Sequence, residues 1–318
     1  MWKSWYAFRR GKKQTGELDA FTYRLEAELS CLQADLEGGT YHHGGYRSFT
    51  VTDNKKRTIL VAGIRDRVVH RLVYEYLVPI YDKTFSYDVW SCRKGKGLLG
   101  AILRIQGLSA RHPRVVVWRA DIRKFFDNID HAILLRILSR KIDDANAMAI
   151  LREIVSSHAA AGSVAPIGIP IGNLTSQIFA NIYLHELDRF VAHALKPLAY
   201  VRYGDDFLVY AADAGCATRF RRSVGAFLHE ALHLEINSKQ DTFVRPWQGL
   251  NVLGMEIFPN GRRLNRRNRA RIMKRLNFAN SPGYHGILRY HGNEKARERF
   301  DWRVLGMLDE EHARADFI

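Results

Sequence analysis

Apolar side chains recur at helical spacing in several parts of the chain. Residues 16–36 have the period of an amphipathic helix, with apolar side chains at Leu18, Phe21, Leu25, Leu29 and Leu32. The same period predicts helices over residues 66–81, 131–142, 173–195 and roughly 214–232. Asp130 is expected to cap the second of these, and Pro197 to stop the third.

Shorter apolar and β-branched runs predict strands. They cover residues 57–63, 114–120, 234–237 and 250–258. Residues 199–210, AYVRYGDDFLVY, predict two strands joined by a tight turn at Gly204-Asp205. The tail from Gly261 is expected to be helical and very basic. Strands and helices mix without a regular alternation, which indicates an α+β protein.

The composition indicates a globular protein with an anionic partner. Hydrophobic residues make up 47% of the 318 residues, and 49 Lys and Arg against 33 Asp and Glu give a net charge of +16. Nucleic acid is the first candidate partner and an anionic membrane surface the second. The three cysteines are far apart, which argues against a disulfide framework or a zinc knuckle. With no secretory signal and no membrane-spanning run, a cytoplasmic protein without membrane contact is expected.

Two acids stand side by side at the tip of the apolar ribbon. Asp205 and Asp206 repel each other, which costs stability unless a cation lies beside them. Both could simply serve the turn, because Asp favours turns. Asp121, at the end of the strand VVVWRAD, would bring a third carboxylate if the two elements pair. Hard oxygen ligands of this kind suit Mg²⁺, and two Mg²⁺ about 3.5–4 Å apart support phosphoryl transfer.

An ordered set of motifs resembles the reverse transcriptases. Tyr203-Gly204-Asp205-Asp206 resembles their YxDD motif, and Asp121 followed by IRKFF resembles their first palm motif. Further similar segments, in the family's order, are KKRTILVAGIRDRVVH, CRKGKG, GIPIGNLTSQ at 168–177, INSKQ with Lys239, and the primer-grip-like NVLGMEIF. The resemblance runs from about residue 16 to the tail, and it rests on the set rather than on any single motif.

The resemblance implies a right-hand polymerase fold, with an antiparallel palm sheet packed on helices. Residues 1–113 would form the N-terminal region and fingers. Residues 114–260 would form the palm, and residues 261–318 a basic helical thumb. The implied activity is RNA-directed DNA polymerase, a nucleotidyltransferase that makes cDNA from dNTPs, an RNA template and a DNA or RNA primer.

Within that family, the loop at residues 171–177 most resembles the reverse transcriptases of diversity-generating retroelements. Ile171-Gly172 and Ser176-Gln177 stand where retroviral and group II intron enzymes usually carry Gln-Gly and Ser-Pro. This implies synthesis that is error-prone at template adenines, mutagenic retrohoming, and a basic, oligomeric accessory variability protein. Gly204 departs from the more usual Ala, Val or Met in YxDD, so a retron-like or phage-defence reverse transcriptase is the alternative.

The resemblance also implies a role for individual residues. The ligands of two Mg²⁺ would be Asp121, Asp205, Asp206 and the carbonyl of Ile122, and Lys239 would protonate the leaving pyrophosphate. The dNTP would contact Lys56, Arg57, Arg65, Phe126 as the steric gate against ribose, Ile171 and Gly172. Template and primer would contact Tyr203, Leu253, Gly254, Arg262, Arg263, Arg266 and Arg267. Each assignment has an alternative interpretation. Lys239 could be a solvated surface side chain, Phe126 could pack in the core, and the arginines could be basic residues of the protein surface.

Two readings from other classes remain. His229-Glu230-Ala231-Leu232-His233 matches the HExxH pattern of zinc peptidases, which places two His one turn apart on a helix. The apolar period of the same segment explains it as an amphipathic helix. The second reading is a non-catalytic RNA-binding protein that keeps the polymerase fold, although all three candidate acids are present.

Overall fold

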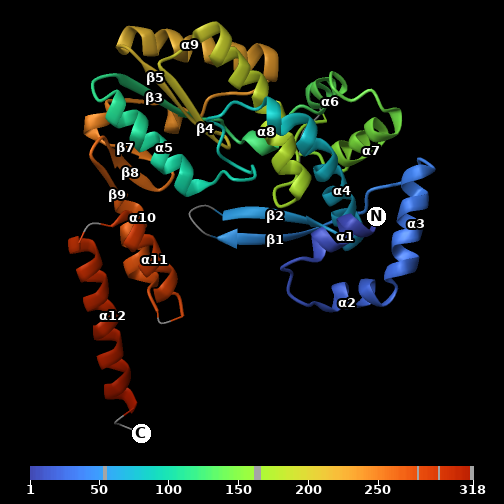
Figure 1. Cartoon of the computed structure of the whole chain (residues 1–318), viewed down its shortest axis with the longest axis horizontal. Coiled ribbons are helices and arrows are strands. Elements are labelled where there is room, and N and C mark those ends of the chain that lie inside the picture. Colours follow the sequence, from blue (N-terminus) through green and yellow to red (C-terminus); the bar gives the residue numbers. More distant parts are fainter. Residues whose placement is uncertain (53–55, 161–165, 278, 293, 316–318) are drawn as a thin grey trace.

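The computed structural model describes residues 1–52, 56–160, 166–277, 279–292 and 294–315, without the side chains of Lys56 and of residues 308–315. Figure 1 shows the arrangement of its elements. The helices are α1 (Trp2–Arg9), α2 (Gly16–Tyr23), α3 (Leu25–Glu37), α4 (Ile64–Tyr81), α5 (Leu98–Arg111), α6 (His131–Ser139), α7 (Ala145–Ser156), α8 (Leu174–Phe190), α9 (Ala214–Leu232), α10 (Arg266–Arg275), α11 (Ser281–His291) and α12 (Glu294–Ala315). The strands are β1 (Tyr46–Thr52), β2 (Lys56–Ala62), β3 (Val116–Asp121), β4 (Ala199–Tyr203), β5 (Asp206–Ala211), β6 (Thr242–Val244), β7 (Leu250–Val252), β8 (Met255–Phe258) and β9 (Gly261–Leu264).

The central sheet has four antiparallel strands in the order β4-β5-β3-β6. The predicted ribbon at residues 199–210 is confirmed as the β4–β5 hairpin, with Gly204 in the left-handed region at φ 68°. β5 also pairs with β3, in a register that sets Asp206 opposite Asp121. The expected α+β class with an antiparallel sheet is therefore present.

The two faces of this sheet contribute to different cores. Trp118, Ala120, Phe207 and Val209 belong to the larger core, which also takes in residues of α4, α6, α7, α8 and α9. The alternate positions Val117, Val201, Leu208 and Tyr210 belong to a second core shared with α5 and β7–β9. This alternation follows the two-residue period of a strand, and it buries the sheet on both faces.

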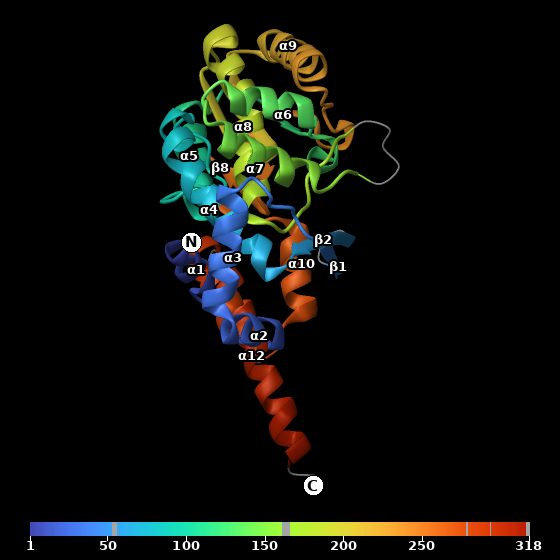
Figure 2. The same cartoon turned by 90° about the vertical axis from the view of Figure 1, so that its right-hand side faces the viewer.

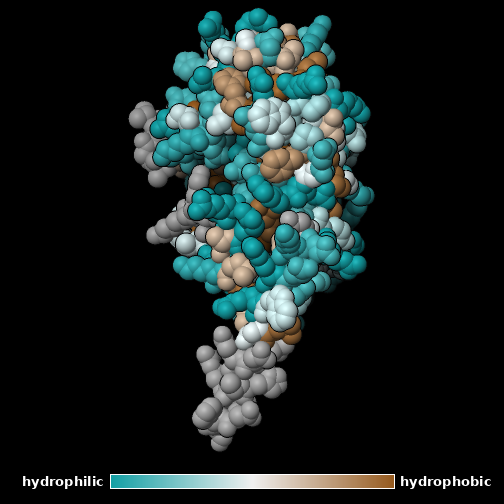
Figure 3. All heavy atoms as spheres, turned by 90° about the vertical axis from the view of Figure 1, so that its left-hand side faces the viewer, coloured by the Kyte–Doolittle hydropathy of each residue, from teal (hydrophilic) through white to brown (hydrophobic). Residues whose placement is uncertain are grey.

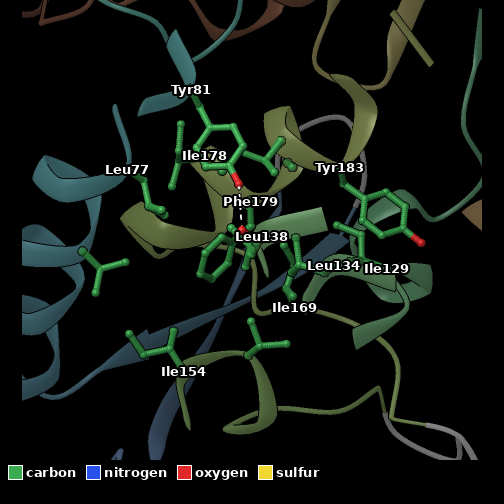
Figure 4. Close-up of a cluster of buried hydrophobic side chains, with 14 of the residues drawn as sticks. Leu77, Tyr81, Ile129, Leu134, Leu138, Ile154, Ile169, Ile178, Phe179 and Tyr183 are labelled. Atoms are coloured by element: carbon green, nitrogen blue, oxygen red, sulfur yellow. Dashed lines mark hydrogen bonds between the residues drawn. The ribbon is translucent and has the colours of Figure 1, made fainter. Parts of the chain in front are cut away.

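The larger core is densely aliphatic around α8. Figure 4 shows Ile178, Phe179 and Tyr183 of this helix among side chains from α4 and α6. The hydroxyl of Tyr81 is satisfied by donating to the carbonyl of Leu138, at 3.4 Å. Burial also raises the pKa of Tyr81 to about 12.

Two further groups of elements flank the sheet. The β1–β2 hairpin and helices α1–α3 lie on the side of α4, while β7, β8 and β9 form a second, three-stranded sheet next to α5 (Figure 1). Helices α10–α12 follow β9, and α12 extends away from the body (Figure 2). In the described part of the chain, no helix is long and apolar enough to cross a membrane.

Several predicted boundaries are wrong in detail. The helix predicted over residues 16–36 divides at Arg24 into α2 and α3. The strand predicted at residues 234–237 is reduced to one bridge, between Ile236 and Ile122. The strand predicted over residues 250–258 is a hairpin that turns at Leu253-Gly254, both with positive φ. The tail begins as β9 rather than as a helix, because residues 261–264 pair with β8.

Candidate active site

Three acids meet where β3 ends and the β4–β5 hairpin turns. Asp121 is the last residue of β3, and the antiparallel register sets its Cα opposite that of Asp206 on β5. Asp205 occupies the turn immediately before. From the sequence, Asp121 is expected to join the other two acids only if these strands pair. β3 and β5 do pair, and this brings the acids together.

The three carboxylates have different partners. Asp206 receives two hydrogen bonds from Arg119, at 3.1 Å from Nε and 2.7 Å from Nη2. Asp121 receives one from the side-chain amide of Asn237, at 2.9 Å. Arg119 stands two residues before Asp121, on the same face of β3, so strand periodicity could have identified it. Asn237 comes from the segment after α9 and belongs to the INSKQ motif, but the sequence did not predict its contact with Asp121.

Asp205 has the most perturbed carboxyl group of the site. Burial raises its pKa to about 7, and the negative charge of Asp121 is the second cause. The pKa of Asp206 is also raised by burial, although Arg119 opposes the rise. Asp121 and Asp205 are therefore neighbouring carboxylates whose repulsion a cation would relieve.

The donor chemistry of Asp121 and Asp205 fits a divalent cation. Carboxylate oxygens are the ligands that Mg²⁺ prefers, and the charge of Asp121 is close enough to raise the pKa of Asp205. Asp206 forms an ion pair with Arg119, with 2.7 Å between Oδ2 and Nη2. Among the described residues, no group of three or more His, Cys, Asp or Glu side chains is placed to hold a metal ion. Ile122, whose carbonyl the resemblance implies as a ligand, is buried directly after Asp121.

A buried ion pair lies beneath the acidic turn. Arg202 of β4 and Asp188 of α8 are both essentially inaccessible, at 0% and 1% exposure, and they form two hydrogen bonds of 2.7 and 2.6 Å. Arg202 also donates to the carbonyl of Gly204 at 3.0 Å. Ser91 accepts the backbone N–H of Gly204 at 2.9 Å. Both backbone polar groups of the turn glycine are thus fixed from below, a feature that no local sequence pattern predicts.

The loop before α8 is fastened to the β1–β2 hairpin. The N–H of Leu60 donates to the carbonyl of Ile171 at 2.9 Å, and Asn173 bonds the backbone of both Leu60 and Ala62. Gly172 has φ 121°, and a Cβ there would lie 2.6 Å from Ile59. The absence of a side chain at Gly172 thus permits a close approach to β2. The resemblance also implies that the backbone at Gly172 approaches the nascent base pair, which stays a prediction.

Phe126 and Lys239 lie in two short 3-10 helices, Phe125–Asn128 and Ser238–Gln240. Phe126 is half-buried against Phe125, with ring centroids 5.4 Å apart, and its carbonyl accepts the N–H of Ile169 at 2.8 Å. The candidate gate is therefore joined to the loop before α8. Lys239 lies in a short 3-10 turn and is exposed, two residues after Asn237, which contacts Asp121.

The candidate triphosphate contacts are dispersed. Arg57 is exposed on β2. Arg65, on α4, pairs with Asp35 and lies over the ring of Tyr41, 5.5 Å from its centroid. The side chain of Lys56 lies outside the described residues. Of the two cations whose side chains the structure describes, Arg65 has a carboxylate partner.

Several candidate template and primer contacts have structural partners. Tyr203 ends β4 opposite Asp206 and packs against the second core. Arg262 bonds Gln106 at 2.5 Å, His291 and the carbonyl of Tyr290, so it ties α11 to α5. Arg263 pairs with Glu256 across the β8–β9 ladder. Arg266 and Arg267 are exposed at the start of α10.

The peptidase pattern does not form a zinc site. α9 ends at Leu232, and His233 turns into the left-handed region at φ 51°. Its Nδ1 lies 3.0 Å from the carboxylate of Asp130. The two histidines therefore do not share a helix face, and in the described part of the chain they belong to no group of three side chains that could hold a metal ion.

The chain has the right-hand fold of nucleic-acid polymerases. Its backbone is similar to that of telomerase from Candida albicans in complex with a TWJ fragment of telomeric RNA, with a TM-score of 0.52 and 12% identity over 83% of this chain and 55% of that one. Apo telomerase from Candida tropicalis gives a TM-score of 0.53 at 11% identity, over 70% of this chain and 55% of the other. At this identity the likeness concerns the fold alone.

Residues 50–257, more than half of the chain, match the family described as reverse transcriptase (RNA-dependent DNA polymerase). The chain therefore belongs to the reverse transcriptase family, and its enzyme class is RNA-directed DNA polymerase. It is 25% identical to protein YkfC of Escherichia coli over 74% of this chain and 72% of that protein. It is 27% identical to the group II intron-encoded protein LtrA of Lactococcus lactis, over 73% of this chain and only 50% of that relative.

Proposed function

We propose that this chain copies an RNA template into cDNA from dNTPs, with Asp121 and Asp205 as the metal-binding pair. The observation that supports it most directly is the β3–β5 register, which sets the end of β3 against the acidic turn. Bound Mg²⁺ would activate the primer 3′-hydroxyl and stabilise the leaving oxygen. Arg119 orients Asp206 and Asn237 orients Asp121. Lys239, exposed two residues after Asn237, would serve as the proton donor.

We propose further roles for Phe126, for the loop before α8 and for the Leu253-Gly254 turn. Phe126 would exclude the ribose 2′-hydroxyl, and the bond between its carbonyl and Ile169 would couple this gate to Ile171 and Gly172. The Leu253-Gly254 turn would contact the primer. We retain the division into fingers, palm and thumb, with the thumb beginning in the region of β9 and α10. A cytoplasmic location is also part of this proposal.

We further propose that the enzyme belongs to a diversity-generating retroelement and works with a basic, oligomeric accessory protein. The support is the apolar Ile171 in place of an amide, since an aliphatic side chain offers no hydrogen bond to an incoming nucleotide. A retron-like or phage-defence enzyme is the alternative, and the error spectrum separates the two. Errors concentrated at template adenines favour the first, while uniform fidelity favours the second. Ile171→Gln should lower the adenine errors.

Primer extension on a defined RNA template with Mg²⁺ tests the activity. Asp205→Asn should abolish cDNA synthesis, because it removes a charged member of the acid pair without changing its shape. Asp143→Asn is the matched control, since Asp143 is an exposed acid away from the site. Equal activity in both variants would refute the assignment of the site. Inactive wild-type protein should be tested again with its cognate RNA and accessory protein, and inactivity there would refute the activity.

A further inference from the structure

The CRKGKG motif belongs to a segment that runs along the outer edge of the central sheet. The N–H of Arg202 on β4 donates to the carbonyl of Asp88, and the N–H of Trp90 donates to the carbonyl of Arg202, both at 2.9 Å. Val89, between these two residues, forms a parallel bridge with Arg202. Residues 86–97, the edge segment, therefore extend the sheet beyond β4.

The end of the edge segment has little apolar area of its own to bury. Apart from Cys92, the motif consists of glycines and cations. Figure 3 shows the side of the molecule that carries α5, the helix that follows the motif, and hydrophilic side chains predominate there with apolar ones scattered among them. Arg93 bonds the carboxylate of Asp82 at 2.7 Å and the carbonyl of Ser86 at 2.8 Å. The motif is therefore held by its charged side chains more than by hydrophobic packing.

The second lysine of the motif, Lys96, lies against two aromatic rings. Its Nζ is 3.6 Å from the ring centroid of Tyr87 and 4.0 Å from that of Trp90, and it donates to the carbonyl of Tyr87 at 2.8 Å. The two rings are nearly perpendicular, at 82°, with their centroids 6.0 Å apart. The negative faces of aromatic rings attract an ammonium. Lys94, two residues earlier, is exposed, so the two lysines have different surroundings.

One of these two rings belongs to the residue directly before Ser91. Trp90 is buried, and a Cβ at Gly100 of α5 would lie 2.5 Å from its ring, so the ring fits closely against this helix. Ser91 is buried too, and its hydroxyl accepts the N–H of Gly204 at 2.9 Å. The contact of Lys96 with Trp90 is thus one residue away from the hydrogen bond that fixes the acidic turn.

We propose that Lys96 is a positioning residue, which closes the edge segment and so holds Ser91 beneath the turn that carries Asp205. Lys96 acts through Trp90 and Ser91 rather than on the reacting atoms. The inference rests on the proposed function in taking Asp205 as a metal-binding acid. The rival interpretation is that Lys96 leaves the rings and contacts a phosphate of nucleic acid, as its charge alone suggests.

The first test observes the turn itself, without catalysis. Hydrogen–deuterium exchange of the Gly204 amide in the full chain reports its bond to Ser91, because an amide exchanges when its hydrogen bond opens. Lys96→Met removes the ammonium and keeps an unbranched stem, and Lys94→Met is the matched control in the same motif. We expect faster exchange at Gly204 in Lys96→Met and in Ser91→Ala, and no change in Lys94→Met. Lys96→Arg should keep the wild-type rate, since a guanidinium also lies well over aromatic rings.

The second test measures cDNA synthesis by primer extension, with thermal unfolding to verify that each variant is folded. Lys96→Met should lower kcat about tenfold or more, because small displacements of a catalytic group have effects of this size. The KM for dNTP and the affinity for template RNA should stay unchanged, and Lys94→Met should leave kcat unchanged. Ser91→Ala should itself lower kcat, and adding Lys96→Met to it should lower kcat little further, because both changes act on the same hydrogen bond.

Three outcomes would overturn the proposal. Unchanged exchange at Gly204 in Lys96→Met would show that the ring contacts do not fix the turn. Faster exchange with full kcat would show that the contacts do not position the acids for catalysis. Weaker RNA binding with a reduced salt dependence, together with unchanged exchange, would assign Lys96 to a phosphate. Because the exchange measurement needs no cDNA, failure of the polymerase proposal would leave its result interpretable.

Discussion

Removing one partner of the buried Arg202–Asp188 pair should destabilise the protein strongly. In Arg202→Met, Asp188 would still accept a hydrogen bond from the hydroxyl of Tyr200, at 2.9 Å, but its charge would have no cationic partner. An uncompensated buried charge of this kind costs about 3–5 kcal/mol. Removing the donor to the carbonyl of Gly204 adds about 1–3 kcal/mol if that group stays buried. Urea unfolding should therefore show a lower midpoint with an unchanged slope.

A double variant separates stability from positioning. Arg202→Met with Asp188→Leu removes both charges, and replacing a buried pair by apolar side chains is often neutral or stabilising. We expect most of the unfolding free energy to return. cDNA synthesis should stay low, because the carbonyl of Gly204 still lacks the Arg202 donor that fixes the acidic turn. A double variant as unstable as Arg202→Met, or one with full activity, would refute this reasoning.

Three further predictions concern single positions. Burial lowers the pKa of His70 to about 3, whereas an unfolded histidine binds a proton below about pH 6.5. Lowering the pH from 7 to 5 should therefore reduce the unfolding free energy by about 2 kcal/mol. His70→Gln should make that loss smaller, while His193→Gln, at an exposed histidine, should leave it unchanged. Gly172→Ala should lower the unfolding free energy of the protein by about 2 kcal/mol or more, because the new Cβ would lie 2.6 Å from Ile59 and φ is 121°. Gly107→Ala, on α5 with no atom near the new Cβ, should raise the unfolding free energy by about 1 kcal/mol. Denaturant unfolding compares the two variants. Phe126→Val should admit rNTPs in primer extension with dNTP synthesis retained, and unchanged selection against rNTPs would show that the ring packs the core instead.

The local elements were predictable where one chain segment carries the whole signal. The helix over residues 214–232 and the β4–β5 hairpin have their own apolar period and their own turn residues, and both have the predicted positions. Asp130 caps α6 as expected, with its carboxylate 3.0 Å from the N–H of Ile133. Capping and turn chemistry depend on neighbouring residues, so the sequence alone contains them.

Features that depend on distant partners were not predictable in this way. β6 is three residues long, and it is a strand only because β3 offers a free edge. Asn237 reaches Asp121 only because the segment after α9 lies beside the end of β3 in the fold. The basic count of the tail predicted nucleic-acid contacts, yet Arg262 and Arg263 have partners within the protein. The composition gives the number of basic side chains, but only the structure shows which of them form hydrogen bonds or ion pairs within the protein.

The turn of the β7–β8 hairpin is fastened to the first turn of α10. The carbonyl of Gly254 accepts bonds from the N–H of Asn265 at 3.1 Å and from the side chain of Asn268 at 3.0 Å. A Cβ at Gly254 would approach that same amide nitrogen too closely for the two to coexist. Two hydrogen bonds to one carbonyl thus join the hairpin to the start of the helix. We expect a displacement of α10 to displace the Leu253-Gly254 turn as well.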